Sequence, residues 1–222
     1  MNGGTYAVAA DGALSLAVAK AGALTAGGDE VFVRESIPAP GEPNGNVIWQ
    51  IAPGQQPQSF SAGMFVDSSV VANGAFVWGY HVWPEAIACD GQNSSEPGCN
   101  PLWGGVRIHD ANGTRDLLSR RQPAPSAVGR VGSEFLAIVG DELVRALPDG
   151  GPQPLLSGVA GSTLVQDGDS VVVGRFSLER VPLDGGPHQI LDTSPMLSYR
   201  SVGVTEAGVW FLRDNTLRFV AR

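Results

Sequence analysis

The stretch "RVPLDGGPHQIL", residues 180–191, decides the fold of this chain, because a near-copy, "RALPDGGPQPLL", stands at residues 145–156. In each copy a Gly-Gly pair separates two apolar, strand-like runs. Glycine readily adopts the positive φ angles of tight hairpin turns. A phosphate-binding loop would instead need a helix start or a P-loop lysine, and neither follows. We therefore interpret Asp184-Gly185-Gly186 and Asp149-Gly150-Gly151 as hairpin turns.

Three more matches to this pattern lie elsewhere in the chain. "GVRIHDANGTRDLLS" (105–119) has Arg107 at the place of Arg180, and "IWQIAPGQQPQSFS" (48–61) keeps the pattern without the arginine. The last match is split between the chain ends. "TLRFVAR" (216–222) matches the first half of the pattern and "NGGTYAVAA" (2–10) matches the second. The pattern therefore predicts five repeats, the fifth of them shared between the two ends.

Each copy is preceded by a small turn and a β-rich run, as in "VANGAFVW" (71–78) and "QDGDSVVV" (166–173). Another apolar stretch stands before each run. Units of about 35 to 45 residues with four short strands are the signature of a β-propeller. We predict an all-β, five-bladed β-propeller of four-stranded antiparallel blades, in which the N-terminal strand completes the C-terminal blade and so removes open sheet edges. A five-repeat piece of a larger propeller is the alternative.

The expected boundaries follow from the repeats. The chain forms one propeller domain over residues 1–222. Its blades are expected at about 21–62, 63–122 with an insertion at 80–105, 123–158, 159–193, and 194–222 together with 1–10.

Three segments resemble the blades of bacterial secreted or surface β-propeller repeat proteins. They are "SLERVPLDGGPHQIL" (177–191), "ELVRALPDGGPQPLL" (142–156) and "VTEAGVWFLRDNTLRFV" (204–220). The resemblance is good over residues 125–222 and weakens upstream. It implies an extracellular, periplasmic or cell-surface location, and it says nothing about activity, because fold does not determine function.

The composition narrows the class of partner. A net charge of −8 argues against binding to nucleic acid, which needs a basic face to neutralise phosphates. No apolar run approaches the ~18 residues that span a bilayer. The 30 glycines and 16 prolines suit frequent turns rather than long helices. We expect a monomer that binds neither nucleic acid nor a membrane by a spanning segment.

The chain has two cysteines, Cys89 and Cys99, both in the polar segment "ACDGQNSSEPGCNP" (88–101). We expect them to form a local disulfide, which implies an oxidising compartment. Two cysteines are too few for a zinc site unless a histidine such as His81 or His109 joins them. The spacing in "DGQNSSE" (90–96) departs from that of a calcium-binding EF-hand loop, so calcium is a minor alternative and no cofactor or metal is expected.

The candidate binding site lies where two blades break the repeat. The loops 35–45 and 80–105 join strands that are only a few residues apart in the later repeats, so they should form a raised rim on one face. The second loop is rich in aromatic residues, which make good binding platforms, although two tryptophans could instead pack on each other. The expected ligand-binding residues are Tyr80, His81, Trp83 and Trp103. Arg120 and Arg121 are added to them from the loop that is expected after the last strand of blade 2.

An enzymatic role is the less favoured reading. A five-bladed glycosidase needs two or three carboxylates that converge at one end of the central channel. Only Asp67 stands at that end of an expected inner strand, whereas Asp167 and Glu206 are near the opposite end. We therefore expect no catalytic residues and a non-enzymatic role in binding a glycan, a peptide or a protein. A purely structural scaffold and a glycosidase-like enzyme are the alternatives.

Overall fold

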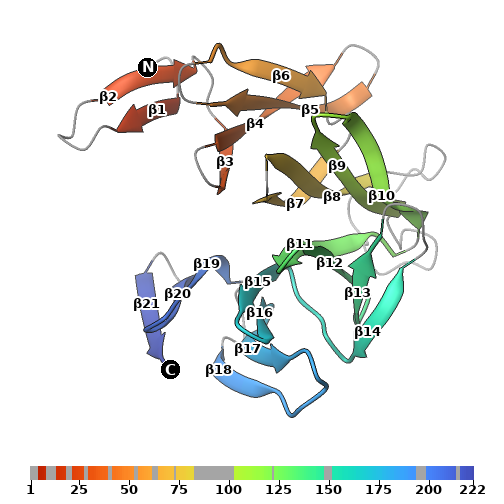
Figure 1. The fold of residues 1–222 in the computed structure, drawn as a ribbon, viewed down its shortest axis with the longest axis vertical. Helices are drawn as coiled ribbons and strands as arrows, with labels where there is room; N and C mark the ends of the chain where they lie inside the picture. Colours follow the sequence, from red (N-terminus) through yellow and green to blue (C-terminus); the bar gives the residue numbers. More distant parts are fainter. Residues whose placement is uncertain are drawn as a thin grey trace, which may run out of the picture.

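The computed structural model describes residues 5–8, 14–18, 22–27, 30–39, 42–52, 55–61, 65–72, 74–82, 103–121, 123–147, 152–193, 199–213 and 216–222. These residues form only strands and their connections, in five sheets arranged around a centre as a five-bladed β-propeller and one separate hairpin (Figure 1). The predicted all-β class and the five-bladed architecture are confirmed.

The first four blades are four-stranded antiparallel meanders. Blade 1 consists of β3 (Ala23–Gly27), β4 (Glu30–Ala39), β5 (Glu42–Ile51) and β6 (Gln58–Ser61). Blade 2 consists of β7 (Phe65–Ala72), β8 (Ala75–Val82), β9 (Trp103–Asp110) and β10 (Gly113–Arg121). Blade 3 consists of β11 (Pro125–Val131), β12 (Glu134–Val139), β13 (Glu142–Ala146) and β14 (Gln153–Ser157). Blade 4 consists of β15 (Thr163–Asp167), β16 (Ser170–Gly174), β17 (Ser177–Pro182) and β18 (Gln189–Thr193).

Blade 5 corrects the predicted closure of the ring. It holds three strands, β19 (Arg200–Thr205), β20 (Gly208–Arg213) and β21 (Thr216–Ala221), in the part of the chain that the structure describes. The expected closing strand β1 (Thr5–Val8) pairs instead with β2 (Leu14–Val18), and Figure 1 shows this hairpin beside blade 1, away from β21. The two strands are close in the sequence, so their pairing costs little loop-closure entropy.

The first strand of each blade lies nearest the centre (Figure 1). Successive inner strands contact each other from β3 to β7, β11, β15 and β19. Among the described residues, β19 makes no comparable contact with β3. In the part of the chain that the structure describes, the five blades therefore form an open arc.

Apolar clusters fill the space between neighbouring blades. In β16, Val171 and Val173 pack against blade 3, whereas Val172 packs against blade 5. Successive side chains of a strand point to opposite faces, so a strand sandwiched between two blades must be apolar at every position. This requirement explains the uninterrupted "VVV" run, and all three valines are at most 4% exposed.

Within a blade, the turn between the first and second strands and the turn between the third and fourth lie at one end, which we call the lower face. The turn between the second and third strands lies at the other end, the upper face. The glycine pair of the quoted stretch is on the lower face. Gly185 has a φ of 83°, and the Gly186 amide donates a hydrogen bond of 2.9 Å to the Asp184 carboxylate. The predicted turn at Gly185-Gly186 is confirmed, whereas 149–151 lies outside the described residues.

The repeated arginine bridges the third and fourth strands. Arg145 donates to Gln153 at 2.9 Å, and Arg180 donates to Gln189 at 2.8 Å. Arg107 does not occupy this position, because the register of blade 2 places Ile108 there. A register shift of one residue moves a side chain to the other face of a sheet. Arg107 therefore points toward blade 1, which corrects the gapless alignment of the repeats.

Candidate functional site

The candidate rim begins with a hairpin of blade 1. Strands β4 and β5 continue through most of the segment 35–45 that was expected to be a loop, and they pair as far as Ala39 and Glu42. The register shifts between Ile37 and Ala39, next to Pro38, which has no N–H to donate. A two-stranded ribbon tolerates proline at such an irregularity. The segment is therefore a hairpin that extends blade 1 at the upper face, and the prediction of a loop is wrong.

Contacts at the root of this hairpin hold it to the blades. The indole N–H of Trp49 donates to the Glu35 carboxylate at 3.1 Å across β4 and β5. The Arg34 guanidinium donates to the backbone carbonyl of Val66 in β7, which ties blade 1 to blade 2. Neither contact was predicted from the sequence. The isolated Trp49 in an apolar run was the only signal, and its partner could not be identified without the register.

The second part of the rim is the insertion of blade 2. Strand β8 ends at Val82 and β9 begins at Trp103, and these two residues pair across the sheet. The chain therefore leaves and re-enters the blade on neighbouring strands at the upper face. Residues 83–102 lie outside the described residues, and with them Trp83, Cys89 and Cys99. The disulfide and the contact between the two tryptophans remain predictions.

Tyr80 belongs to the core. Its side chain is 1% exposed and lies in the cluster between blades 1 and 2, with Phe32, Phe76 and Trp78. The Arg107 guanidinium covers its ring at 4.8 Å. The structure thus places Tyr80 beneath the rim, where it supports the strands rather than presenting a surface to a ligand.

The remaining expected residues gather at the upper end of blade 2. His81 is half-buried and pairs with Gly104 across β8 and β9, and Arg121 pairs with Gly104 from the other side. Arg120 and Arg121 lie in β10, not in the loop after it, which corrects their predicted placement. The backbones of His81, Trp103 and Arg121 are therefore close neighbours. The side chains of Trp103, Arg120 and Arg121 lie outside the described residues.

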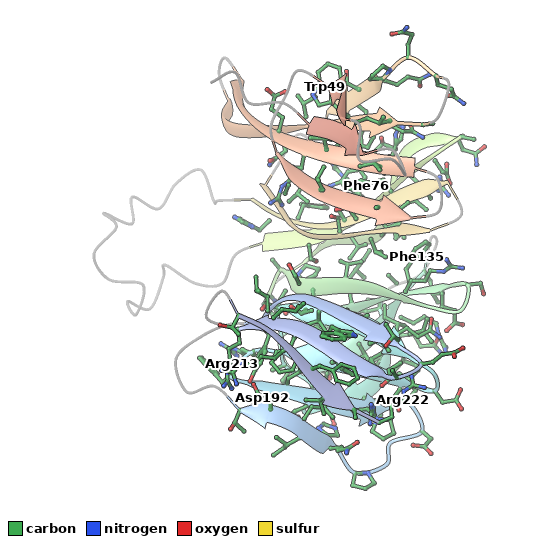
Figure 2. The ribbon with its side chains drawn as sticks, turned by 90° about the vertical axis from the view of Figure 1, so that its left-hand side faces the viewer. Trp49, Phe76, Phe135, Asp192, Arg213 and Arg222 are labelled. Carbon is green, nitrogen blue, oxygen red and sulfur yellow. The ribbon has the colours of Figure 1, made fainter. Side chains whose placement is uncertain are left out.

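Of the three carboxylates considered for an enzyme, Asp167 is held by two arginines, and the side chain of Asp67 lies outside the described residues. Asp167 is 6% exposed on the lower face and accepts from Arg180 at 2.7 Å and from Arg222. Asp192, on blade 4, accepts from Arg213 at 2.6 Å and from Tyr199 at 3.0 Å. Figure 2 shows Asp192 beside Arg213, and Arg222 away from them. The described residues contain no group of three histidine, cysteine, aspartate or glutamate side chains that could hold a metal.

Tyr199 illustrates how tightly this region is packed. Burial and the Asp192 carboxylate raise the pKa of its phenol to about 12. Its hydroxyl therefore stays protonated at physiological pH and donates to Asp192 as a permanent link between blades 4 and 5. Such a group positions strands and is not poised to exchange protons.

A shallow groove of about 750 Å³ lies on the lower face between blades 3 and 4. Residues in or beside the hairpin turns line it, among them Gly132, Gln166, Asp169 and Asp184. The Gly132 amide donates to the Gln166 side chain at 3.2 Å across the groove. The groove is made of the hairpin turns that end each blade, and the upper face carries the features that depart from the repeat. In the described part of the chain, no helix has the length and apolar character needed to cross a membrane.

Comparisons with known proteins show the fold and no more. No protein-family model matches the chain, and no curated protein sequence matches it. Solved structures are similar in fold. The computationally designed Ika8 protein has a TM-score of 0.54 and 15% identity, over 90% of this chain and 57% of its own. A chain of the nidogen/laminin complex has a TM-score of 0.53 and 13% identity, over 83% of this chain and 68% of its own.

The CNH domain of AfRom2 is similar to the same degree, with a TM-score of 0.53 and 12% identity, over 96% of this chain and 68% of the domain's chain. At these identities the similarity is one of architecture alone. This chain spans 57% of the length of the Ika8 protein, so it corresponds to part of that structure. A propeller is consistent with a binding or a scaffold role, and the choice between them depends on the site.

Proposed function

We propose that this chain is a non-enzymatic binding module that takes its ligand on the upper face over blades 1 and 2. One observation carries the proposal: the extended β4–β5 hairpin and the insertion between Val82 and Trp103 depart from the repeat on adjacent blades and at the same face. In blades 3 and 4 the corresponding connections are two residues long, between β12 and β13 and between β16 and β17. Loops carried on a rigid scaffold are the usual place for recognition.

The ligand class that fits is a glycan, a peptide or a protein. The net charge of −8 disfavours anionic polymers. The exposed part of the rim would be formed by His81, Trp103 and Arg121, whose backbones lie together, with Trp83 from the insertion. Tyr80 and Arg107 act beneath them as supports, because Tyr80 packs between blades 1 and 2 and Arg107 covers its ring.

The setting of this function is an oxidising compartment. We infer a secreted or cell-surface bacterial protein, because Cys89 and Cys99 can close a short disulfide in the insertion and because three repeats resemble bacterial surface propellers. The protein would act as a monomer. A count of free thiols after purification without reductant tests the compartment, and two reactive thiols would contradict it.

The binding proposal is tested with glycan and peptide arrays on the wild type and on Trp103→Ala and His81→Ala. The matched control is Phe176→Ala. Phe176 is 59% exposed and lies in the turn between β16 and β17, on the same face but on blade 4. We expect a ligand whose binding falls about tenfold or more in the rim variants, because aromatic anchors dominate such interfaces, and is unchanged in the control. Absence of any ligand, or an equal loss in Phe176→Ala, would reject the proposal.

A further inference from the structure

Blade 5 presents an apolar surface away from blade 4. Trp210 on β20 and Phe219 on β21 pair across the sheet with ring centroids 4.4 Å apart, and each side chain is 40% exposed. Leu217, two residues before Phe219 on the same face, is 64% exposed. We call these three residues the blade 5 patch. Large apolar side chains that gather on a surface mark interaction sites.

In blades 3 and 4, the residue at the position equivalent to Trp210 is covered by the next blade. Trp210 occupies the position that Val172 occupies in blade 4, two residues after the turn into the second strand. Val172 is 0% exposed because blade 5 covers it. Leu136, at the same position in blade 3, is 1% exposed because blade 4 covers it. Leu217 likewise takes the place of Leu178, which is 0% exposed, so Trp210 and Leu217 lie at positions that are buried in blade 4, and Phe219 takes the place of the half-buried Arg180.

The edge of blade 5 is also that of an incomplete blade. In blades 1 to 4, the third strand pairs with a fourth strand: β5 with β6, β9 with β10, β13 with β14 and β17 with β18. Within the described residues, β21 pairs with β20 only, and Thr216 to Phe219 are all exposed. An exposed edge strand offers main-chain donors and acceptors to an added strand. In the other four blades, an antiparallel fourth strand occupies the edge that is open in β21. We therefore expect an antiparallel strand to bind there as well.

The charge of blade 5 indicates which residues a strand added to β21 would contain. Although the whole chain has a net charge of −8, the described residues of blade 5 contain four arginines and one acidic residue, Glu206. Arg213 and Arg222 form ion pairs with blade 4. Arg218 lies on β21 between Leu217 and Phe219, is exposed, and forms no ion pair with another described residue. An added strand would meet apolar side chains on one of its faces and this guanidinium on the other.

We propose that β21 binds an extended segment of another protein whose residues alternate between apolar and acidic. Successive residues of a strand point to opposite faces, so apolar residues opposite Leu217 and Phe219 place acidic residues opposite Arg218. The apolar side chains cover the exposed rings of Trp210 and Phe219. The main chain completes blade 5 as β18 completes blade 4. This site is separate from the rim on blades 1 and 2 and does not depend on it.

A second copy of the chain fits this edge less well. Two β21 strands paired antiparallel about Arg218 would bring one guanidinium against the other, and directly opposed like charges destabilise a sheet. Each copy also carries the same net charge of −8, which opposes association. The acidic, apolar segment satisfies both the patch and the arginine.

The experiment uses a fluorescent peptide of about ten residues that alternates leucine and glutamate, and its binding to the full chain is followed by anisotropy. A peptide of the same composition with leucines and glutamates in separate blocks controls for pattern, and a leucine–lysine peptide controls for charge. We expect saturable binding of the alternating acidic peptide alone. Phe219→Ser should weaken it about tenfold or more, since an apolar anchor is lost.

Two further variants make the result specific. Arg218→Glu should lose the acidic peptide and gain the leucine–lysine peptide, a reversal that a merely unfolded blade cannot produce. Phe176→Ser, which alters a more exposed phenylalanine on blade 4, should bind as the wild type does. Equal binding of the block peptide, no reversal in Arg218→Glu, or equal loss in Phe176→Ser would overturn the proposal. Self-association of the free protein that Phe219→Ser abolishes would also overturn it, in favour of a second copy at this edge.

Discussion

Gly129 and Gly203 occupy the same position in the inner strands of blades 3 and 5, two residues before the end of β11 and β19. A Cβ atom on Gly129 would lie 2.7 Å from the Leu164 Cγ and 2.8 Å from the Leu164 carbonyl oxygen, in the inner strand of the next blade. A Cβ atom on Gly203 would meet no atom within 4 Å. The difference marks where the arc of blades is open.

This pair gives a direct test of the open arc. Gly129→Ala should lower the free energy of unfolding by about 2 kcal/mol, because the backbone of Leu164 cannot move aside cheaply. Gly203→Ala should be neutral, or stabilising by up to about 1 kcal/mol, because alanine restricts the unfolded chain. Urea denaturation of both variants measures the difference. If Gly203→Ala costs as much as Gly129→Ala, another blade packs against β19 in solution.

The sequence predicts the blades well because their physics is local or periodic. The buried "VVV" run of β16 and the turn at Gly185 follow from strand sandwiching and from glycine geometry. An apolar second strand and a Gly-Gly pair also occur in the near-copy of this repeat, at residues 135–138 and 150–151. Even the repeated Arg180 and Gln189 have a simple cause, since they face each other across β17 and β18.

The errors arise where register or competition between partners decides the structure. The strand Thr5–Val8 has two possible partners, and the pattern alone does not rank a nearby β2 above a distant β21. The alignment of Arg107 with Arg180 is wrong by one residue of register, and an alignment without gaps cannot reveal such a shift. The segment 35–45 was predicted to be a loop because the matching connections in later repeats are short, but two strands continue through most of it. For the site, the burial of Tyr80 could not be foreseen, because its position depends on which face of β8 meets blade 1.

Among the described carboxylates, the nearly buried Asp167 should be the most costly to remove. Its side chain is 3% exposed and pairs with Arg180 and Arg222, so it joins the lower ends of blades 4 and 5. Asp167→Ala should destabilise the protein by about 3 kcal/mol, because two arginines lose a buried partner. Arg222→Ala should cost about 1 kcal/mol, because that arginine is 45% exposed. Asp169→Ala, two residues away and exposed, is the control and should change the urea midpoint little.

His109 should make the stability depend on pH in the acidic range. Its imidazole stacks on the ring of Phe60, with the two ring centroids 3.8 Å apart. Burial lowers the pKa of His109 below the ordinary 6.5, although the neighbouring Asp110 acts to raise it. The unfolded chain therefore takes up the proton at a higher pH than the folded chain. The stability that the neutral ring contributes is complete above about pH 6.5 and is lost as the pH falls toward the lowered pKa.

His109→Gln should flatten this dependence. The variant keeps His81 and His188, so the difference between the two stability profiles isolates His109. Urea denaturation at a series of pH values below neutrality measures it, together with an NMR titration of the imidazole. Parallel profiles for the two proteins would show that the ring titrates alike in the folded and unfolded states.

Reduction of the predicted Cys89–Cys99 disulfide should affect the insertion and leave the blades intact. A disulfide that closes a short local loop restricts little of the unfolded chain outside that loop. We expect faster proteolytic cleavage within residues 83–102 after reduction and a nearly unchanged thermal unfolding of the remainder. Cys89→Ser with Cys99→Ser should reproduce the effect without reductant. Unfolding of the whole protein on reduction would mean that the insertion helps to hold the blades together.

Asp110 should remain ionised to an unusually low pH. The Arg115 guanidinium donates to both carboxylate oxygens at 2.8 Å, and the Asn112 amide adds a third hydrogen bond of 2.8 Å. Arg115 is the main cause that lowers the pKa of Asp110 from 3.8 to about 2. Because the folded pKa is below the unfolded one, the stabilising contribution is complete above about pH 4 and disappears as the pH falls toward 2.

Arg115→Gln should therefore raise the pKa of Asp110 toward its ordinary value and remove this acid-labile contribution. The chemical shift of the Asp110 carboxyl carbon, followed from neutral pH to pH 2, reports the change at the residue itself. Arg145→Gln removes an arginine that bonds across two strands to Glu134 at 2.7 Å in blade 3, and it should leave Asp110 unaltered. If Asp110 titrates near 2 without Arg115, the backbone amide of Asn112 and the turn that holds it are sufficient to stabilise the carboxylate.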